Sequence, residues 1–557
     1  MDSKIHYDIT IFMLAAYILA AVTIALTTWI FITWKKRKNY PPGPFPLPLI
    51  GNLHLLRKDI HIAMDVLSKQ YGDMFTLWMT DIPYIVITDI TLAKKVALTK
   101  KFANRLPLYV GDKLYSRGCK DIIFGDYGEA LILHKRMAHS ALSMFGKGLF
   151  CFEDRIMSSV DALINTLNEN KENEMFSLND DVELACFNVM SSIVLGTSLD
   201  KEDERFQKLR NAVFYMMQSG VTLSLINFYP ILRYLPNKDL KGMIKVLSER
   251  DEVLKNILDY TISTYQCGQV TNYIEALLKA RSDIEETEGQ GYVSNILSRD
   301  HIEMNIFDMF LGGVETVSTT LMWALLYLMK WPETQHKCHC ELDEVLGMPN
   351  ERSRVVYKDK DSLPYIQAVV LETLRLASTL PFGVFHKARE DVELNGYRIQ
   401  KGKKNLSLTA NPVHCLIINI LFHIYYLFLR KNYIYLLFTG TATMINIWSI
   451  HHDEKNYNDP LIFKPERFLD ESGKLIPLSE RTHFFAFSCG PRQCIGQSLG
   501  KTELFLFLAN LLQHFHFKSS PLNEELSIYG TTKVTHAPHP YKIYARRRHG
   551  DDKENKK

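Results

Sequence analysis

One segment near the carboxyl end combines residue types that could ligate a metal ion. It reads FSCGPRQCIG from Phe487 to Gly496. A thiolate that ligates iron needs neighbouring N–H groups turned toward sulfur, and Gly490 and Gly496 permit the tight backbone that does this. Arg492 adds a permanently charged fork that can hold a carboxylate. A lone buried cysteine is most often an apolar filler, but this pattern favours Cys494 as a metal ligand.

The same ten residues resemble the haem-binding loop of the cytochrome P450 family, Phe-x-x-Gly-x-Arg-x-Cys-x-Gly, at every specified position. The resemblance implies that Cys494 is the axial thiolate ligand of a haem b iron. It also implies that Arg492 binds a haem propionate, and that Phe487, Gly490 and Gly496 complete the cofactor-binding loop.

A second segment places an acid beside an alcohol. The run GGVET at residues 312–316 interrupts a strongly apolar helical pattern, and in isolation it favours a locally weakened helix with a solvated Glu315. Next to the loop above, it resembles the distal helix of the same family. There, small residues make room for dioxygen and the acid and alcohol relay protons. The resemblance assigns these catalytic roles to Glu315 and Thr316.

A third pattern predicts a charged network. Glu372 and Arg375 lie three residues apart, so they can pair on one helix face. The resemblance adds Arg467, from the segment PERF at 465–468, as the third member of a buried network. Such a network specifies geometry more reliably than it stabilises.

The sequence departs from the family at an early helix that usually carries Trp-x-x-x-Arg, whose side chains reach a haem propionate. Leu131 and Lys135 stand at these positions. Leucine cannot donate a hydrogen bond, and lysine is a point donor where arginine is a fork. We therefore expect weaker haem retention than is usual, with Lys135, His386 and Arg492 as the propionate-binding residues by resemblance.

The amino-terminal region predicts a membrane anchor. Residues 9–34 carry no charge and are followed by the basic run KKRK, a length that spans a bilayer and a flank that stays cytosolic. Because the basic residues follow the apolar run, a retained anchor is favoured over a cleaved signal. We expect a short luminal end at 1–8, a transmembrane helix at 9–34, and a basic stop with a stiff Pro-rich hinge at 35–48.

The remaining chain predicts a mainly α fold with small β-sheets. Helical periodicity marks 155–167 and 302–329, whereas 84–87 reads as a strand and 392–399 as a hairpin with an Asn395-Gly396 turn. The resemblance implies a cytochrome P450 fold, with a catalytic domain at 49–544 and a charged, solvated tail at 545–557.

Residues 403–440 look like an insert in this domain. Leu, Ile, Phe, Tyr, Lys and Asn make up 27 of the 38 residues, and no acid occurs. This composition suggests a translated intron, and the hypothesis fails if the mature transcript contains these codons at high abundance. A lineage-specific loop and a second membrane contact are the alternatives, although the apolar stretch 415–429 is short for a span.

Composition excludes other classes. The net charge is +3, from 65 basic and 62 acidic residues, so no basic field drives binding to nucleic acid. Nine cysteines in 557 residues are too few for a disulfide-stapled secreted scaffold.

The resemblance implies a haem-thiolate monooxygenase of the microsomal animal type, held in the endoplasmic reticulum membrane as a single-pass protein with a cytosolic catalytic domain. Its implied partners are NADPH–cytochrome P450 reductase, with cytochrome b5 as a further candidate, dioxygen and an apolar small molecule. Residues 446–453 and 504–515 are similar to the branch that contains steroid 17-alpha-hydroxylases and xenobiotic-metabolising enzymes. Two alternatives stay open: a haem-thiolate isomerase or dehydratase that does not use dioxygen, and a haem-deficient product of a defective gene model.

Overall fold

The computed structural model describes most of the chain. The described residues are 2–56, 59–106, 108–144, 150–169, 174–219, 224–266, 270–347, 354–401, 441–519 and 526–548. The expected insert at 403–440 and the last nine residues of the expected tail lie outside them.

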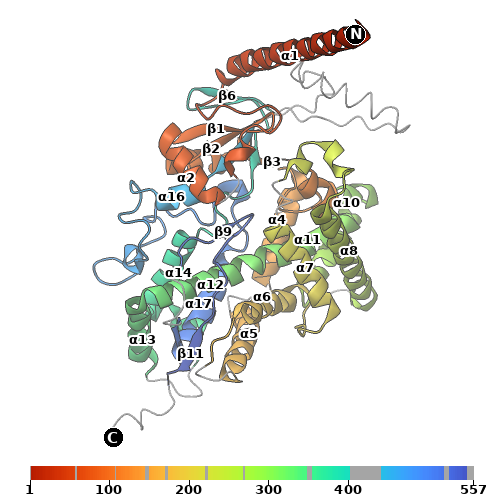
Figure 1. Ribbon diagram of the computed structural model, residues 1–557. Helices are drawn as coiled ribbons and strands as arrows, with labels where there is room; N and C mark the ends of the chain where they lie inside the picture. The colour runs from red at the N-terminus through yellow and green to blue at the C-terminus, as the bar shows by residue number, and fades with distance from the viewer. Residues whose placement is uncertain are drawn as a thin grey trace.

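Helices make up most of the described body, which confirms the mainly α fold predicted from periodicity (Figure 1). The α-helices are α1 (Asp2–Arg37), α2 (Ile60–Tyr71), α3 (Ile90–Leu98), α4 (Glu129–Met144), α5 (Phe150–Glu169), α6 (Asn179–Val194), α7 (Glu204–Gln218), α8 (Lys238–Thr264), α9 (Tyr273–Glu288), α10 (Gln290–Ile296), α11 (Arg299–Gly313), α12 (Glu315–Lys330), α13 (Pro332–Leu346), α14 (Pro364–Ala377), α16 (Ile447–His452) and α17 (Gln497–His514). Short helical turns are η1 (Leu53–Leu56), η2 (Lys100–Phe102), η3 (Val110–Tyr115), η5 (Leu225–Asn227), η6 (Pro230–Arg233), η7 (Tyr357–Ser362), η8 (Pro465–Phe468) and η9 (Gly490–Arg492).

The strands form small sheets, as expected. Their bounds are β1 (Met74–Met79), β2 (Ile82–Ile87), β3 (Asn104–Arg105), β4 (His386–Lys387), β5 (Val392–Leu394), β6 (Tyr397–Ile399), β7 (Ala442–Ile445), β8 (Phe515–Lys518), β9 (Thr531–Thr532), β10 (His536–Ala537) and β11 (Tyr544–Arg547). One sheet has the order β1-β2-β7-β4-β3, in which β2 and β7 are parallel. The β5–β6 hairpin turns at Asn395 and Gly396 with φ of 49° and 80°, which is the turn that the Asn-Gly pair predicted.

The core lies around α11 and α12, which run through the middle of the helical region (Figure 1). Helices α6 and α17 pack against α12, and side chains such as Phe307 and Trp323 are fully buried. The predicted run 302–329 is thus two helices that meet at Val314, where φ is −89° and ψ is −68°. The interruption falls at the motif that contains Glu315 and Thr316.

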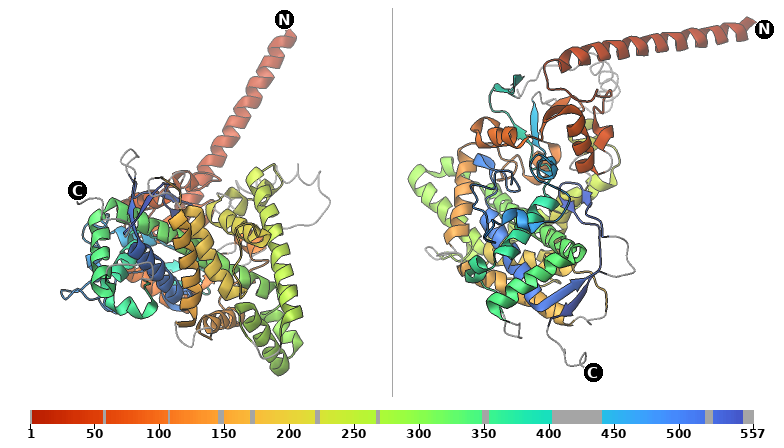
Figure 2. Two further views of the ribbon diagram at one scale, coloured as in Figure 1. Left: turned by 90° about the horizontal axis from the view of Figure 1, so that it is seen from below. Right: turned by 90° about the vertical axis from the view of Figure 1, so that its left-hand side faces the viewer.

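Helix α1 projects away from the body in every view (Figures 1 and 2). It is long and apolar enough over Tyr7–Arg37 to cross a membrane, and it is largely exposed. Helices α10–α12 also contain a stretch of sufficient length and hydropathy, but that stretch is mostly buried in the core.

The Pro-rich hinge lies against the sheet. Thr76 N of β1 donates to Pro42 O at 2.8 Å, and a Cβ at Gly43 would lie 2.0 Å from Thr76 O. Trp29 of α1 contacts Phe45 edge-to-face, with ring centroids 5.7 Å apart. The hinge therefore connects α1 to β1 through fixed contacts.

The charged tail begins later than the sequence predicted. Residues 544–547 form β11, which pairs with β8, and Ala545 is buried. Arg548 forms an ion pair with Asp343 at 2.6 Å, and its side chain is only 9% exposed. A paired strand and a partly buried ion pair thus extend the fold to Arg548, four residues beyond the boundary expected at 544.

Candidate functional site

The Cys494 loop, residues 487–496, is held close to α3 by a glycine. Gly490 has φ of 72°, and a Cβ there would lie 2.3 Å from Ala97 O, so only glycine fits. Gly496 differs, because its φ is −86°, which any residue adopts, and a Cβ would make an ordinary 4.0 Å contact with Cys494 Sγ. A glycine is thus required at Gly490, whereas Gly496 turns its N–H toward the Cys494 sulfur without a positive φ.

The Cys494 thiol is accessible but enclosed. Cys494 is exposed, while burial raises the pKa of its thiol and the Gly496 N–H and the Lys135 charge lower it. Its own N–H donates to Phe487 O at 3.1 Å, and Phe487 packs against the main core. A sulfur that receives a backbone N–H and lies near a lysine charge is suited to ligating a metal.

Arg492 is turned into the protein. It donates to three backbone carbonyls, those of Ala103 at 2.6 Å, Ile122 at 3.1 Å and Gly125. Burial lowers the pKa of its guanidinium to about 10, although Asp126 acts in the opposite direction. The side chain thereby joins the Cys494 loop to the segment 121–126.

His386 positions a second arginine. Its Nδ1–H donates to Phe102 O at 2.9 Å, which leaves Nε2 to accept from Arg105 Nη1 at 3.4 Å. Burial, together with the charge of Arg105, lowers the pKa of His386 to about 3, so the ring is neutral. Arg105 also donates to Ile123 O and Val384 O. Both ring nitrogens of His386 therefore contact protein groups, and its propionate-binding role stays a prediction.

Lys135 lies beside the Cys494 loop. Its Nζ donates to Pro491 O at 2.8 Å and Gln493 O at 3.1 Å, while Leu131 is buried one helical turn earlier on α4. Burial and the charges of Arg492 and Arg105 lower the pKa of Lys135 to about 8. Three cations thus act on one another at this place, which is an arrangement suited to binding an anion.

The charged network expected from the sequence is assembled in the structure. Arg375 donates to both oxygens of Glu372 at 2.7 and 2.8 Å, and both side chains are fully buried. Arg467 Nε donates to Glu372 Oε1 at 3.2 Å. The three side chains join α14 to η8.

At the junction of α11 and α12, accessible residues interrupt a buried surface. Gly312 is exposed with nothing within 4 Å of a Cβ position, and Thr316 is half-buried and donates to Gly312 O at 2.6 Å. Gly313 instead faces α6, where a Cβ would lie 2.5 Å from Met190 Sδ. Gly312 fits the expected role of making room for a small molecule, and Gly313 serves helix packing.

Glu315 is buried at 7% exposure. Its Oε1 accepts from Gln218 Nε2 at 2.8 Å and from Thr535 Oγ1 at 3.3 Å. Burial raises the pKa of the carboxyl group to about 7, although Gln218 and Thr535 favour the ionised form. Such a carboxyl group can both give and take a proton near neutral pH.

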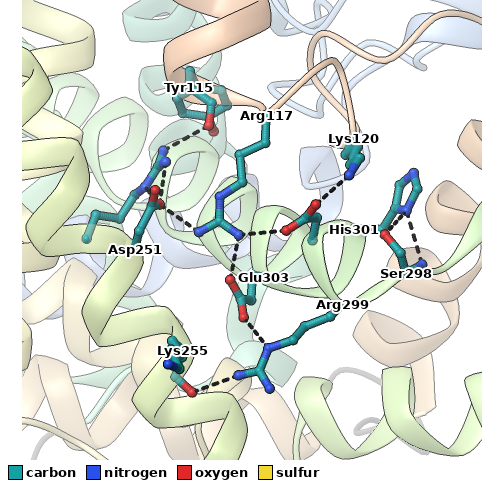
Figure 3. A network of polar contacts seen from close by, with 11 residues as sticks. Tyr115, Arg117, Lys120, Asp251, Lys255, Ser298, Arg299, His301 and Glu303 are labelled. Atoms are coloured by element: carbon teal, nitrogen blue, oxygen red, sulfur yellow. Dashed lines mark hydrogen bonds and ion pairs between the residues drawn. The ribbon is translucent and has the colours of Figure 1, made fainter. Parts of the chain in front are cut away.

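The segment 110–126 contacts both α11 and the Cys494 loop, and Figure 3 shows the polar contacts around Arg117. Arg117 pairs with Glu303 at 2.6 Å and with Asp251 at 2.9 Å. Farther along, the buried Asp308 accepts from Tyr115 OH at 2.7 Å and Ile122 N at 2.6 Å. These contacts position the carbonyls that Arg492 and Arg105 bind.

Sequence reasoning missed Arg105 and Asp308. Each is a charged residue buried by partners that are far away in the sequence, Val384 for Arg105 and Tyr115 for Asp308. An acid within the apolar run of α11 was the one available signal for Asp308, since charged residues are rarely buried without a partner.

The model of the cytochrome P450 family matches residues 41–409 and 431–545. The chain belongs to the cytochrome P450 family. The match omits residues 410–430, which lie within the expected insert.

Curated relatives of this cytochrome P450 extend over nearly the whole chain. A steroid 17-alpha-hydroxylase/17,20 lyase of Squalus acanthias is 32% identical over 514 residues, covering 91% of this chain and 92% of the relative. Cytochrome P450 2J3 of Rattus norvegicus is 29% identical over 545 residues, covering 96% and 97%. A solved zebra fish cytochrome P450 with progesterone has a TM-score of 0.70 at 28% identity, covering 87% of this chain and 99% of that one. These likenesses confirm the expected fold.

The residues present fit the haem that this family binds. The Cys494 sulfur receives the Gly496 N–H. Close by, the charge of Arg492 lowers the pKa of both Arg105 and Lys135. A thiolate and clustered cations match the iron and the two carboxylates of a haem.

Proposed function

We propose that this cytochrome P450 is a monooxygenase that inserts one atom of dioxygen into an apolar small molecule. The observation that carries the proposal is the pair at the start of α12, where a buried Glu315 with a pKa of about 7 adjoins an accessible Thr316. An acid and an alcohol at this place can deliver the protons that cleavage of dioxygen consumes.

Cys494 would hold the iron of a haem b, and Arg105, Lys135 and Arg492 would face its carboxylates. When bound, the haem supplies the oxygen chemistry, with a thiolate donating electron density to iron. The chain contributes the thiolate, enclosure by α11 and α12, and protons held at Glu315 and Thr316. Glu372, Arg375 and Arg467 fix the position of α14 relative to η8.

The relatives support a substrate class for this proposal. Steroid 17-alpha-hydroxylases among them, and the progesterone named for a similar structure, support a steroid-like substrate. Xenobiotics and other apolar molecules stay within the proposal, because residues 446–453 and 504–515 are similar to a branch that also contains xenobiotic-metabolising enzymes. Electrons would come from NADPH–cytochrome P450 reductase, with cytochrome b5 as a second donor, at the endoplasmic reticulum membrane that α1 would span.

The first experiment is a reduced carbon monoxide difference spectrum of the full chain in membranes. The proposal expects the red-shifted Soret band of a thiolate-ligated haem, and its absence would favour the haem-deficient alternative. Cys494→Ser is the matched variant that should lose this band.

The second experiment supplies NADPH, the reductase and dioxygen with progesterone as probe. Oxygenated product should require both NADPH and dioxygen, and the Glu315→Gln variant should form it about 100-fold more slowly. Conversion of a peroxide substrate without either co-substrate would instead indicate the isomerase or dehydratase class. The intact Glu315–Thr316 pair argues against that class, which needs no proton delivery to dioxygen.

A further inference from the structure

Three elements that are distant in the sequence meet at the Glu315 carboxyl group. Gln218 is the last residue of α7, Glu315 is the first of α12, and Thr535 lies in the turn between β9 and β10. Gln218 Nε2 lies 2.8 Å from Glu315 Oε1 and 3.0 Å from Thr535 Oγ1. Thr535 Oγ1 lies 3.3 Å from the same carboxyl oxygen, so the three side chains form a closed set.

The backbone holds this set in place. Val534 N donates to Met217 O at 3.2 Å, which joins the β9–β10 turn to the end of α7. Trp323 Nε1 of α12 donates to His536 O at 2.9 Å. The turn is thus fixed to both helices on either side of Thr535, which is fully buried.

Glu315 depends on these donors. The groups that act on its titration are the neutral donors Gln218, Thr535 and Thr319 and the like-charged Glu183 of α6. A buried carboxylate among neutral donors keeps its ionised form only through their hydrogen bonds. Because Gln218 and Thr535 both converge on Oε1, the acid proton is left to Oε2.

We propose that Gln218 and Thr535 are positioning residues for Glu315, which fix its carboxyl group at the start of α12 and select Oε2 as the oxygen that transfers the proton. The inference rests on the proposed function only for the assignment of proton transfer to Glu315. The inference predicts that α7 and the β9–β10 turn control proton transfer from Glu315. They do so through Gln218 and Thr535, without a contact of these two side chains with the Cys494 loop.

The first test needs no turnover. The infrared band of the Glu315 acid, identified by its loss in Glu315→Gln, is titrated with pH in the full-length protein. Gln218→Met and Thr535→Val each remove one donor at nearly constant volume, so the midpoint should move upward by about 0.5 to 1 pH unit, a threefold to tenfold change in the acid constant. Thr535→Ser keeps the hydroxyl, and Gln207→Ala alters an exposed residue of α7, so both should titrate as the original chain does.

The second test measures product formed per NADPH consumed, with progesterone as probe. Gln218→Met and Thr535→Val should lower this ratio about threefold to tenfold, and neither should lower it further in a Glu315→Gln background. An equal fall in both backgrounds, or an unchanged infrared midpoint in both variants, overturns the inference. If the original chain forms no product but the midpoint moves, the monooxygenase proposal fails and the positioning role stands. The carbon monoxide band verifies that each variant folds.

Discussion

Lys135 Nζ lies 2.8 Å from the carbonyl oxygen of Pro491. The ammonium group thereby binds the backbone of the Cys494 loop three residues before Cys494. Its charge lowers the pKa of the Cys494 thiol. A guanidinium fork could hold a propionate with two parallel bonds, whereas this point charge is shared between two loop carbonyls. Lys135, which departs from the family pattern, therefore holds the Cys494 loop through its contacts with two carbonyl groups.

Replacing Lys135 by Met should loosen the loop and remove a charge that favours the thiolate. We expect a smaller share of the reduced carbon monoxide complex to show the red-shifted thiolate band. The ratio of thiolate-ligated to other complex should fall about tenfold, given a contribution of about 1.5 kcal/mol from a hydrogen bond of a charged group. Lys135→Arg is the control, since it keeps the charge and adds the fork. Equal spectra for Lys135→Met and the original chain would contradict the loop contact.

Gly490 and Gly496 should respond differently to alanine. Gly490→Ala places a Cβ 2.3 Å from Ala97 O at a φ of 72°, so it should cost about 2 kcal/mol or more and lower haem content. Gly496→Ala meets only a 4.0 Å contact and should fold nearly unchanged. Haem per protein and a urea midpoint measure both, and equal losses would show that the loop is held differently.

The buried network should be far more sensitive than an exposed ion pair. Arg375→Met removes two hydrogen bonds from the fully buried Glu372 carboxylate and leaves it the longer contact with Arg467, for which we expect a loss of about 3 kcal/mol in the free energy of unfolding. Lys337 is 57% exposed and pairs with Glu466 at 2.6 Å, so Lys337→Met should cost below about 1 kcal/mol. Urea unfolding of the two variants decides this, and similar midpoints would count against a structural role for the network.

Glu315 should make stability depend on pH. Its pKa is about 7 when folded and 4.5 as the ordinary value, so between these values the folded state keeps a proton that the unfolded state has lost. Stability therefore falls as pH rises through this window, by on the order of 3 kcal/mol in total.

Glu315→Gln removes that dependence while the other titrating groups stay the same. The difference in unfolding free energy between the variant and the original chain should grow in the variant's favour from about pH 4.5 to pH 7 and then level off. A difference that stays constant over this window would show that the carboxyl group is ionised throughout.

The sequence predicted what local pattern controls. Hairpin 392–399, the helix at 155–167, and the pairing of Glu372 with Arg375 depend on spacing along one element, and each is present in the structure. The strand β7 follows the expected insert. Its position in the middle of a sheet, between β2 and β4, depends on pairing across long stretches of chain and could not be read locally.

The site was less predictable where tertiary contacts determine a side chain's role. His386 is expected to bind a propionate, and no sequence pattern indicated that its ring nitrogens also contact Phe102 O and Arg105 Nη1. The partners of Glu315 come from α7 and the β9–β10 turn, which are 97 and 220 residues away. No spacing rule connects such positions, because the fold alone brings them together.

The contacts of the hinge with β1 have a mechanical consequence. Because Pro42 and Gly43 lie against Thr76, the hinge is not a swivel between α1 and the body. With α1 in a bilayer, as proposed, a change in the tilt of α1 would change the tilt of the sheet by the same rotation, because the hinge is fixed to β1. The lipid surface would then set the orientation of the whole catalytic body, and a thicker or thinner membrane would rotate that body rather than stretch a linker.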